Sequence, residues 1–279
     1  MATISQSNPG MIGVKASTQG GSMPFVLQVT TMTWRSVKNT LRVPAAIIPG
    51  ILISIFFLFI YTGTLGDAAQ FLPGLAGQSY LGFILPLSVL SAALSGSTLA
   101  GEGIVRDIEN GYFDKLMLTP ASRAALLLGH MISGALLLVV QTLVVIGVAL
   151  LMGLNPATGV VGVIALIGIA LLLGTAFAGL PVGVALATGS SAATSGASFL
   201  FFPLSFLTAS FVPLNLLSGW IETAALYNPV TYVIEAGRAL LNTGWDNEVM
   251  LRGFSSIAVM GAIFFGFALY ALRIRLKRK

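Results

Sequence analysis

The sequence predicts an all-α membrane protein with six transmembrane helices, and three observations support this fold class. The 279 residues are 56% hydrophobic and only 8% charged, with a mean hydropathy of +0.94. Apolar runs recur along the chain at a length of about 20 residues, which as a helix crosses a hydrocarbon core of roughly 30 Å. Charged residues gather between these runs. The chain also lacks cysteine, which excludes disulfides, thiol catalysis and thiolate metal sites.

Two regions precede the first span. Residues 1–24 are rich in Ser, Thr, Gly and Gln and have no apolar signal-peptide core, so we expect a disordered cytoplasmic tail. Residues 25–42 predict an amphipathic helix in the cytoplasmic headgroup layer, with Trp34, Val37 and Leu41 on one face. The polar face would carry Gln28, Arg35, Lys38 and Arg42. We expect Trp34 to anchor this helix and its cations to lie near anionic lipid, although a positive flank that only fixes topology is the alternative.

Six apolar windows are candidate spans of a single domain over residues 25–279. They cover residues 44–65, 81–100, 124–152, 159–185, 196–212 and 253–272. The fifth window is short and contains Pro203, with Pro213 just beyond it, so we expect it to bend or to end early.

The cations predict the orientation of these spans. Six spans bring both termini to one side, together with the segment between the second and third spans. Twelve of the 14 Lys and Arg residues lie on that side, which leaves only Arg238 and Arg252 opposite. Because positive charge is retained on the cytoplasmic side, we expect both termini and the 101–123 segment to be cytoplasmic in a bacterial inner or plasma membrane.

The segment before the last span, residues 215–252, is too polar for a full span and too apolar for a free loop. Its aromatic residues are typical of a membrane interface. They are Trp220, Tyr227, Tyr232 and Trp245. Short re-entrant helices would satisfy their own backbone polar groups in the outer leaflet. The sequence therefore predicts a helical outer cap before span six.

The segment "GEGIVRDIENGYFDKLMLTPASR" at residues 101–123 is the most charged part of the chain. Seven ionised side chains in the bilayer centre would cost about 20 kcal/mol in total, so the segment must lie outside the hydrocarbon. These side chains are Glu102, Arg106, Asp107, Glu109, Asp114, Lys115 and Arg123. The residues alone fit two structures equally well, a short helix that docks to a protein groove or a solvated loop with weak local ion pairs.

Catalytic and ion-coupled functions find little support in the sequence. His130 is the only histidine and has no carboxylate near it in the sequence, so we predict no metal site and no catalytic residue. No P-loop motif is present, so any ATP hydrolysis must occur on another chain. The predicted spans contain almost no ionisable residues, unlike those of ion-coupled carriers. The excess of basic over acidic residues is explained by the orientation of the chain in the membrane rather than by nucleic-acid binding.

Two sequence blocks resemble one family. The run R-[DE]-x-E-x-G-x-x-x-x-L-x-x-[TS]-P-x-[SR] extends from Arg106 to Ser122, with Glu102 before it. It is similar to the cytoplasmic loop of type-2 ABC exporter permeases. The second block comprises Phe211, Pro213, Trp220 and "YNPVTYVIEAGRALL" at 227–241, and it resembles the final outer segment of the same family. It departs from the family at "PLNLLSGW", where many members carry a second proline. The resemblance covers about residues 25–275 and extends to daunorubicin-resistance-type drug exporter permeases.

The resemblance implies a permease subunit powered by a separate protein. Two cytosolic ABC ATPase subunits would bind ATP and Mg, while this chain binds no cofactor and pairs with a second copy or a related permease. The 101–123 segment would supply a cytoplasmic coupling helix that enters a groove of the ATPase. The expected coupling residues are Glu102, Arg106, Asp107, Glu109, Gly111, Asp114 and Lys115. The interfacial residues Trp34, Arg35 and Lys38 would support them, and the outer motif would include Asn228, Pro229, Tyr232, Glu235 and Arg238.

The sequence leaves the identity of the cargo open. Apolar and small polar residues in the spans favour a hydrophobic or amphipathic substrate, such as a drug, an antibiotic or a lipid. A polysaccharide or glycolipid export permease is an alternative. The Asn-Pro pairs at 155–156 and 228–229 make an aquaporin-like channel a weaker alternative. A membrane scaffold is another weaker alternative.

Overall fold

A computed structural model describes residues 23–66, 79–208 and 213–277, and all of the structure described below lies in these ranges. The expected disordered tail lies almost entirely outside them, as do Phe211 of the outer motif and the last two basic residues. Five described helices are long and apolar enough to cross a membrane. They are α2 (Ile48–Leu65), α3 (Tyr80–Glu109), α5 (Arg123–Leu151), α6 (Gly159–Thr188) and α11 (Asn247–Lys277). A 3₁₀ turn, Pro44–Ala46, precedes α2.

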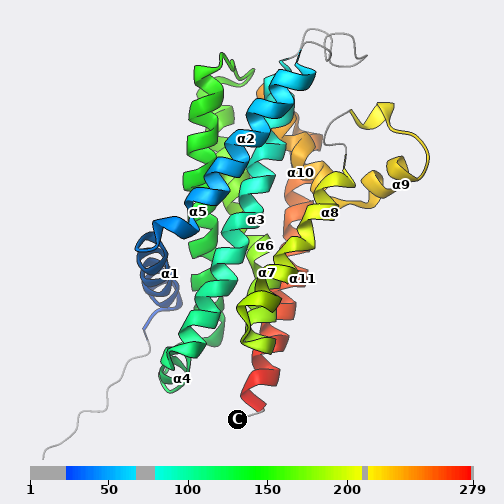
Figure 1. Ribbon diagram of the computed structural model, residues 1–279. Helices are drawn as coiled ribbons and strands as arrows, with labels where there is room; N and C mark the ends of the chain where they lie inside the picture. Colours follow the sequence, from blue (N-terminus) through cyan, green and yellow to red (C-terminus); the bar gives the residue numbers. More distant parts are fainter. Residues whose placement is uncertain (1–22, 67–78, 209–212, 278–279) are drawn as a thin grey trace, which may run out of the picture.

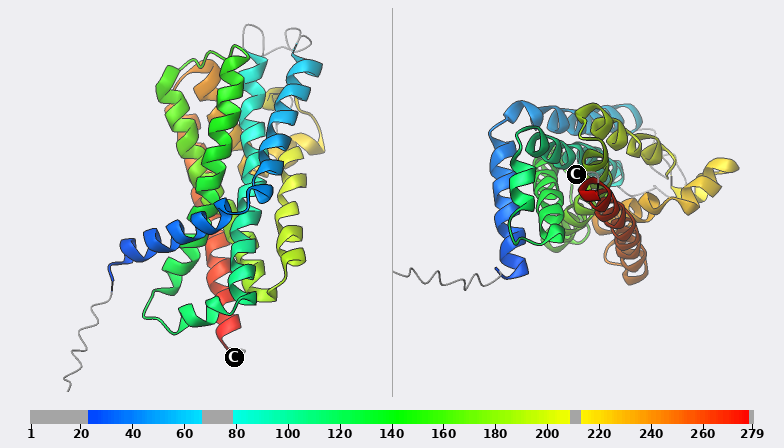
Figure 2. Two further views of the ribbon diagram at one scale, coloured as in Figure 1. Left: turned by 60° about the vertical axis from the view of Figure 1, so that its left-hand side comes forward. Right: turned by 90° about the horizontal axis from the view of Figure 1, so that it is seen from below.

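The five long helices form a bundle in which α3 and α6 lie innermost (Figures 1 and 2). Small residues let α3 and α5 approach closely, because a Cβ atom on Gly134 would lie 2.5 Å from the carbonyl oxygen of Gly96. Helix α3 is buried over most of its length, with 78% of its apolar window covered by the rest of the chain. Helix α2 lies at the periphery, since only 22% of its window is buried.

The predicted fifth span is divided into two short helices, α7 (Ser191–Phe199) and α8 (Phe201–Phe206). The physical cause is Pro203, which has no N–H for the carbonyl of Phe199 four residues earlier, and helix α7 ends at that residue. Neither helix is long enough to span a membrane alone. The two follow each other along the side of the bundle (Figure 1).

The two ends of the bundle differ in what they carry. Helix α1 (Phe25–Leu41), helix α4 (Tyr112–Met117) and the C-terminal end of α11 lie together at one end, called the basal end here (Figures 1 and 2). Toward the opposite, distal end lie α9 (Trp220–Tyr227), α10 (Pro229–Arg238) and a π-helical turn, Ala239–Thr243. With the 3₁₀ turn Leu214–Leu216, these elements form what we call the distal cap. The short helices predicted before the last span are therefore present.

Candidate functional site

The charged segment 101–123 is mostly helical, and its first half continues a long helix. Helix α3 runs through the predicted end of span two at residue 100 and stops at Glu109. The chain then turns at Gly111, whose φ of +66° is favoured by glycine, and enters α4. The expected separate helix is thus only the six residues of α4. The charged residues before Gly111 belong to the basal end of α3.

An ion pair joins α1 to this end of α3. The guanidinium of Arg35 donates from Nη1 to Asp107 Oδ2 at 2.9 Å and from Nη2 to Asp107 Oδ1 at 2.6 Å. Two parallel bonds of this kind are the strongest geometry for an arginine and a carboxylate. The Arg35 guanidinium also lies 3.7 Å from the centre of the Tyr112 ring. Burial acts to lower the pKa of Arg35, but the hydrogen bond and charge of Asp107 outweigh it, so the pKa lies above its usual value.

His130 on α5 is a third partner of this pair. Its Nε2 lies 3.2 Å from Asp107 Oδ2 and its Nδ1 lies 3.1 Å from the carbonyl oxygen of Leu126, with 2% of the residue exposed. A carboxylate is therefore near His130 in space, although none is near it in the sequence. The helices α3 and α5 bring together two residues 23 positions apart, which no local sequence pattern signals. We call Arg35, Asp107, Tyr112 and His130 the basal junction.

Helix α1 packs on the bundle through a face that the sequence did not predict. Its buried residues are mostly polar, namely Gln28, Thr33, Ser36, Val37 and Thr40. Of the three apolar residues expected to share one face, only Val37 is buried, whereas Trp34 is 69% exposed and Leu41 is also exposed. Gln28 accepts a hydrogen bond from the backbone N–H of Ser122 at 2.7 Å, which fixes α1 against the start of α5. Mostly polar residues thus face the bundle, whereas Trp34 and Leu41 remain exposed to another environment.

The other predicted coupling residues lie around the junction but do not join it. Glu102 Oε1 accepts a hydrogen bond from Ser195 Oγ at 3.2 Å, which links α3 to α7. Arg106 lines a cleft of about 460 Å³ beside Arg35 and Asp107. Glu109, Asp114 and Lys115 are exposed. Phe113 and Leu116 of α4 are buried against apolar residues of α3, α5, α6 and α11, so the charged face of α4 points outward.

Arg275 near the end of α11 also belongs to this region, although no sequence pattern distinguishes it from the other cations of the basic tail. Its Nη1 donates to the carbonyl oxygen of Leu186 at 3.0 Å, and its guanidinium lies 5.6 Å from the Phe113 ring. Arg275 therefore ties the ends of α6 and α11 to α4.

The outer motif residues have a different environment in the distal cap. Asn228 caps α10 by accepting from the N–H of Val230 at 3.0 Å, and its Nδ2 donates to the carbonyls of Leu204 and Leu207 at 2.8 and 3.0 Å. Pro229 takes the first helical position, where no N–H is needed. Tyr232 donates to the carbonyl oxygen of Leu226 at 2.8 Å.

Arg238 is buried at the end of α10, where its Nε donates to the carbonyl oxygen of Phe83 at 2.9 Å. Its guanidinium lies 3.5 Å from the Phe83 ring centre. Burial lowers the pKa of Arg238 to about 9, although the charge of Glu235 acts in the opposite direction. Burial also raises the pKa of Glu235.

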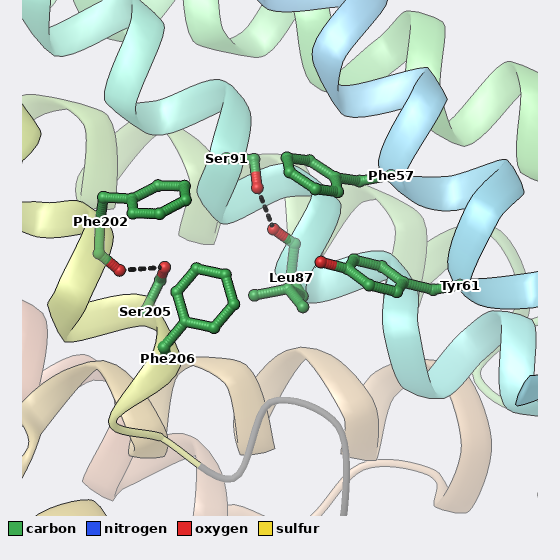
Figure 3. Close-up of a pocket in the computed structure, with 7 residues that line it drawn as sticks. All are labelled: Phe57, Tyr61, Leu87, Ser91, Phe202, Ser205 and Phe206. Atoms are coloured by element: carbon green, nitrogen blue, oxygen red, sulfur yellow. Dashed lines mark hydrogen bonds between the residues drawn. The ribbon is translucent and has the colours of Figure 1, made fainter.

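A groove runs along the bundle between α2, α3 and the α7–α8 pair, and we call it the lateral groove. Its larger part has a volume of about 590 Å³ and is lined by apolar and hydroxyl side chains, including Ile53, Phe56, Ser91, Ser95, Ser198 and Phe199. A narrow part continues it between Phe57, Tyr61, Leu87 and Phe206, where aromatic rings from α2 and α8 face α3 (Figure 3). No described residue that lines either part is ionisable apart from Tyr61.

No group of three or more His, Asp and Glu side chains within residues 23–66, 79–208 and 213–277 is arranged to hold a metal ion. The polar groups of the basal junction bind one another, and the lateral groove offers mainly apolar surface. The arrangement thus combines a charged contact region at one end with an apolar path along one side.

Comparison with known proteins identifies the family. The model of the ABC-2 type transporter family matches residues 27–242. The chain is 29% identical over 226 residues to a probable doxorubicin resistance ABC transporter permease, DrrC of Mycobacterium tuberculosis, and the match covers 81% of each chain. It is 23% identical over 257 residues, 89% of each chain, to the daunorubicin resistance ABC transporter permease DrrB1 of Streptomyces coeruleorubidus. The chain therefore belongs to the ABC-2 type transporter family, as a membrane permease subunit and not as the ATPase.

Proposed function

We propose that this chain is the permease of an ATP-driven exporter that moves a hydrophobic or amphipathic molecule out of the cytoplasm or the inner leaflet. The family implies a multi-pass membrane protein that partners with an ABC ATPase subunit. We also propose a contact surface for that ATPase, a path for the cargo and an orientation in the membrane. The observation that carries it is the family match over residues 27–242, combined with the charged α4 exposed at the basal end.

The proposed ATPase contact is the outer face of α4 with the adjoining end of α3. Asp114 and Lys115 are exposed there, and Leu118 is 88% exposed just after α4. An exposed apolar side chain beside charges of both signs suits a protein groove better than water. ATP and Mg would bind to the partner, and two ATPase subunits would meet two permeases, either copies of this chain or a related one.

The basal junction would transmit the movement of α4. The ion pair of Arg35 and Asp107 joins α1 to α3, and the contact with His130 extends it to α5. A displacement of α4 would therefore carry α1 and the basal ends of α3 and α5 together. ATP binding would then favour one conformation of the bundle through its different affinity for the two states.

The proposed orientation has the basal end in the cytoplasm. Nine described cations lie at that end, namely Arg35, Lys38, Arg42, Arg106, Lys115, Arg123, Arg273, Arg275 and Lys277. Helix α6 ends at the basal end and α11 begins at the distal end, so the chain between them must cross the bundle once (Figure 1). We assign that crossing to α7 and α8, which gives six crossings within a permease domain of residues 25–279. The exposed apolar side chains of α1 would then lie in the headgroup layer.

The proposed cargo path is the lateral groove. Its aromatic and hydroxyl lining suits a large molecule with an apolar body and a few polar groups. Two relatives are named for resistance to doxorubicin and daunorubicin, which are amphipathic polycyclic drugs. Doxorubicin is therefore a suitable first probe.

The test is a charge exchange at Arg106 and Glu109, measured with the permease and its partner ATPase in proteoliposomes. The Arg106→Glu, Glu109→Arg double variant keeps the net charge but reverses the pattern beside α4. We expect doxorubicin-stimulated ATP hydrolysis and transport to fall by at least about tenfold, the equivalent of about 1.4 kcal/mol of coupling.

The matched control is the Glu248→Arg, Arg252→Glu double variant. It exchanges the two charges of an ion pair on the exposed distal part of α11, away from α4. We expect this control to transport at the wild-type rate. Unchanged transport in the Arg106 and Glu109 exchange would overturn the proposed coupling site.

A further inference from the structure

Gln141 on α5 is the polar side chain that the fold explains least. It is 0% exposed, and neither its Nε2 nor its Oε1 has a hydrogen-bond partner in the described part of the chain. A buried amide without partners costs the full desolvation of both polar atoms. Polar groups inside membrane helices are also rare away from functional sites. The protein therefore keeps an unfavourable group at this position.

Gln141 lies directly behind the wall of the lateral groove. A Cβ atom on Gly50 of α2 would lie 2.9 Å from Gln141 Nε2 and 2.3 Å from Ser95 Oγ of α3. The amide, the hydroxyl and the bare backbone of Gly50 thus meet at one point. Gly50 and Ser95 both line the larger part of the groove. Any larger residue at position 50 would push the amide and the hydroxyl apart.

The helix that covers the amide also has the smallest buried share among the five candidate spans of the described chain. Only 22% of the apolar window of α2 is buried, compared with 50% for α5. A small displacement of α2 at Gly50 would open the amide to the groove without breaking a side-chain hydrogen bond of Gln141, because it makes none in the described structure. An amide with two donors and an acceptor, beside a hydroxyl, matches a carbonyl or hydroxyl group.

We propose that Gly50, Ser95 and Gln141 form a hydrogen-bonding subsite of the lateral groove, which binds a neutral carbonyl or hydroxyl group on an otherwise apolar cargo. No charged side chain lines the larger part of the groove, so the recognised group is neutral. This inference rests on the proposed function, since it takes the groove as the cargo path. In this proposal, these three residues are the part of the path that recognises a polar group on the cargo.

The first test measures access and needs no cargo. The chain has no cysteine, so a Gln141→Cys variant carries a single thiol. We expect N-ethylmaleimide, a small neutral reagent, to label this variant at least about tenfold faster than a Thr142→Cys variant, because only a solvated thiol forms the reactive thiolate. Thr142 is the matched control, as it is equally buried on α5 and its hydroxyl also has no partner. Equal labelling of the two variants would overturn the subsite.

The second test measures binding and stability with a Gln141→Leu variant. We expect doxorubicin to bind about tenfold more weakly, the loss of roughly one good hydrogen bond, while the melting temperature of the ligand-free protein does not fall. Thr142→Val should change neither quantity. A lowered melting temperature in Gln141→Leu would mean that the amide has a structural partner and would overturn the proposal. If the wild-type protein binds doxorubicin, an affinity that Gln141→Leu leaves unchanged would also overturn the proposal.

The two tests separate this subsite from the proposed cargo. If Gln141→Cys is labelled fast but the protein does not bind doxorubicin, the result would support an accessible subsite at Gln141 and would reject doxorubicin as the cargo. A Gly50→Ala variant should slow the labelling of Gln141→Cys, because the added methyl group occupies the point where the three residues meet.

Discussion

The basal junction and the distal cap are both polar, but they satisfy their polar groups in different ways. At the junction, side chains bind side chains across three helices, as in the contacts of Asp107 with Arg35 and His130. In the cap, side chains bind backbone carbonyls, as Asn228 does with Leu204 and Leu207. Arg35 has a carboxylate partner that keeps its pKa high, whereas burial lowers the pKa of Arg238, whose Nε is bound by a neutral carbonyl.

This difference teaches which end can move. A backbone carbonyl has a position fixed by its own helix, so bonds of the kind that Asn228 makes hold one local structure. A side-chain ion pair can separate and form again when two helices shift. The junction therefore suits the proposed transmission of ATPase movement, and the cap suits a static scaffold for the groove.

The largest effect is expected from Arg35→Ala at the junction. The change leaves the buried carboxylate of Asp107 without its cation, and breaking a buried pair costs about 3–5 kcal/mol, or less here because Arg35 is partly exposed. We expect transport coupled to ATP hydrolysis to be lost and the melting temperature to drop. Thr30→Ala, at an exposed threonine of the same helix, is the control and should retain both. A transporting Arg35→Ala variant would refute a role for the ion pair.

A smaller effect of a different kind is expected from Asn228→Ala in the cap. The variant loses the N-cap of α10 and two bonds to the end of α8, which together stabilise by about 1–3 kcal/mol. We expect a lower melting temperature but normal coupling per folded molecule. Asn155→Ala, at an exposed asparagine, provides the comparison. If Asn228→Ala were instead to uncouple ATP hydrolysis at normal stability, the cap would not be a static scaffold.

The smallest effect is expected from His130→Leu. Asp107 keeps Arg35, so the variant loses only the contacts of His130 with Asp107 and with the carbonyl oxygen of Leu126, about 1 kcal/mol each. We expect a small decrease in melting temperature and continued transport, with Ser133→Ala as a control at another buried polar residue of α5. In the Arg35→Ala background the same change should cost more, since His130 is then the remaining partner of Asp107. Equal costs in the two backgrounds would show that the junction does not act as a unit.

Several features of the fold could be predicted from the sequence because they depend on local composition. Four of the predicted spans correspond to α2, α5, α6 and α11 within a few residues, since an apolar run of sufficient length forms a helix wherever it lies. Pro203 correctly indicated an interrupted fifth window. The family also followed from two sequence blocks, and the match over residues 27–242 confirms it.

The candidate site could be predicted only in part. The segment 101–123 was selected by its charge, yet charge alone did not distinguish the buried Asp107 from the exposed Asp114. The sequence did not predict which face of α1 packs on the bundle. That face is mostly polar, and the apolar residues Trp34 and Leu41 lie on the exposed side of the helix. His130 and Arg275 were missed because each has a partner on another helix.

The membrane class, the approximate spans, the charge asymmetry and the family follow from the amino-acid sequence alone. These properties are sums over neighbouring residues, and hydrophobicity and charge add along the chain without regard to packing. The folded bundle was needed to see that Arg35, Asp107 and His130 meet, and that Gln141 lies unpaired behind Gly50. Such contacts depend on how closely particular helices approach and on their rotation about their own axes, which are fixed by the packing of the whole bundle.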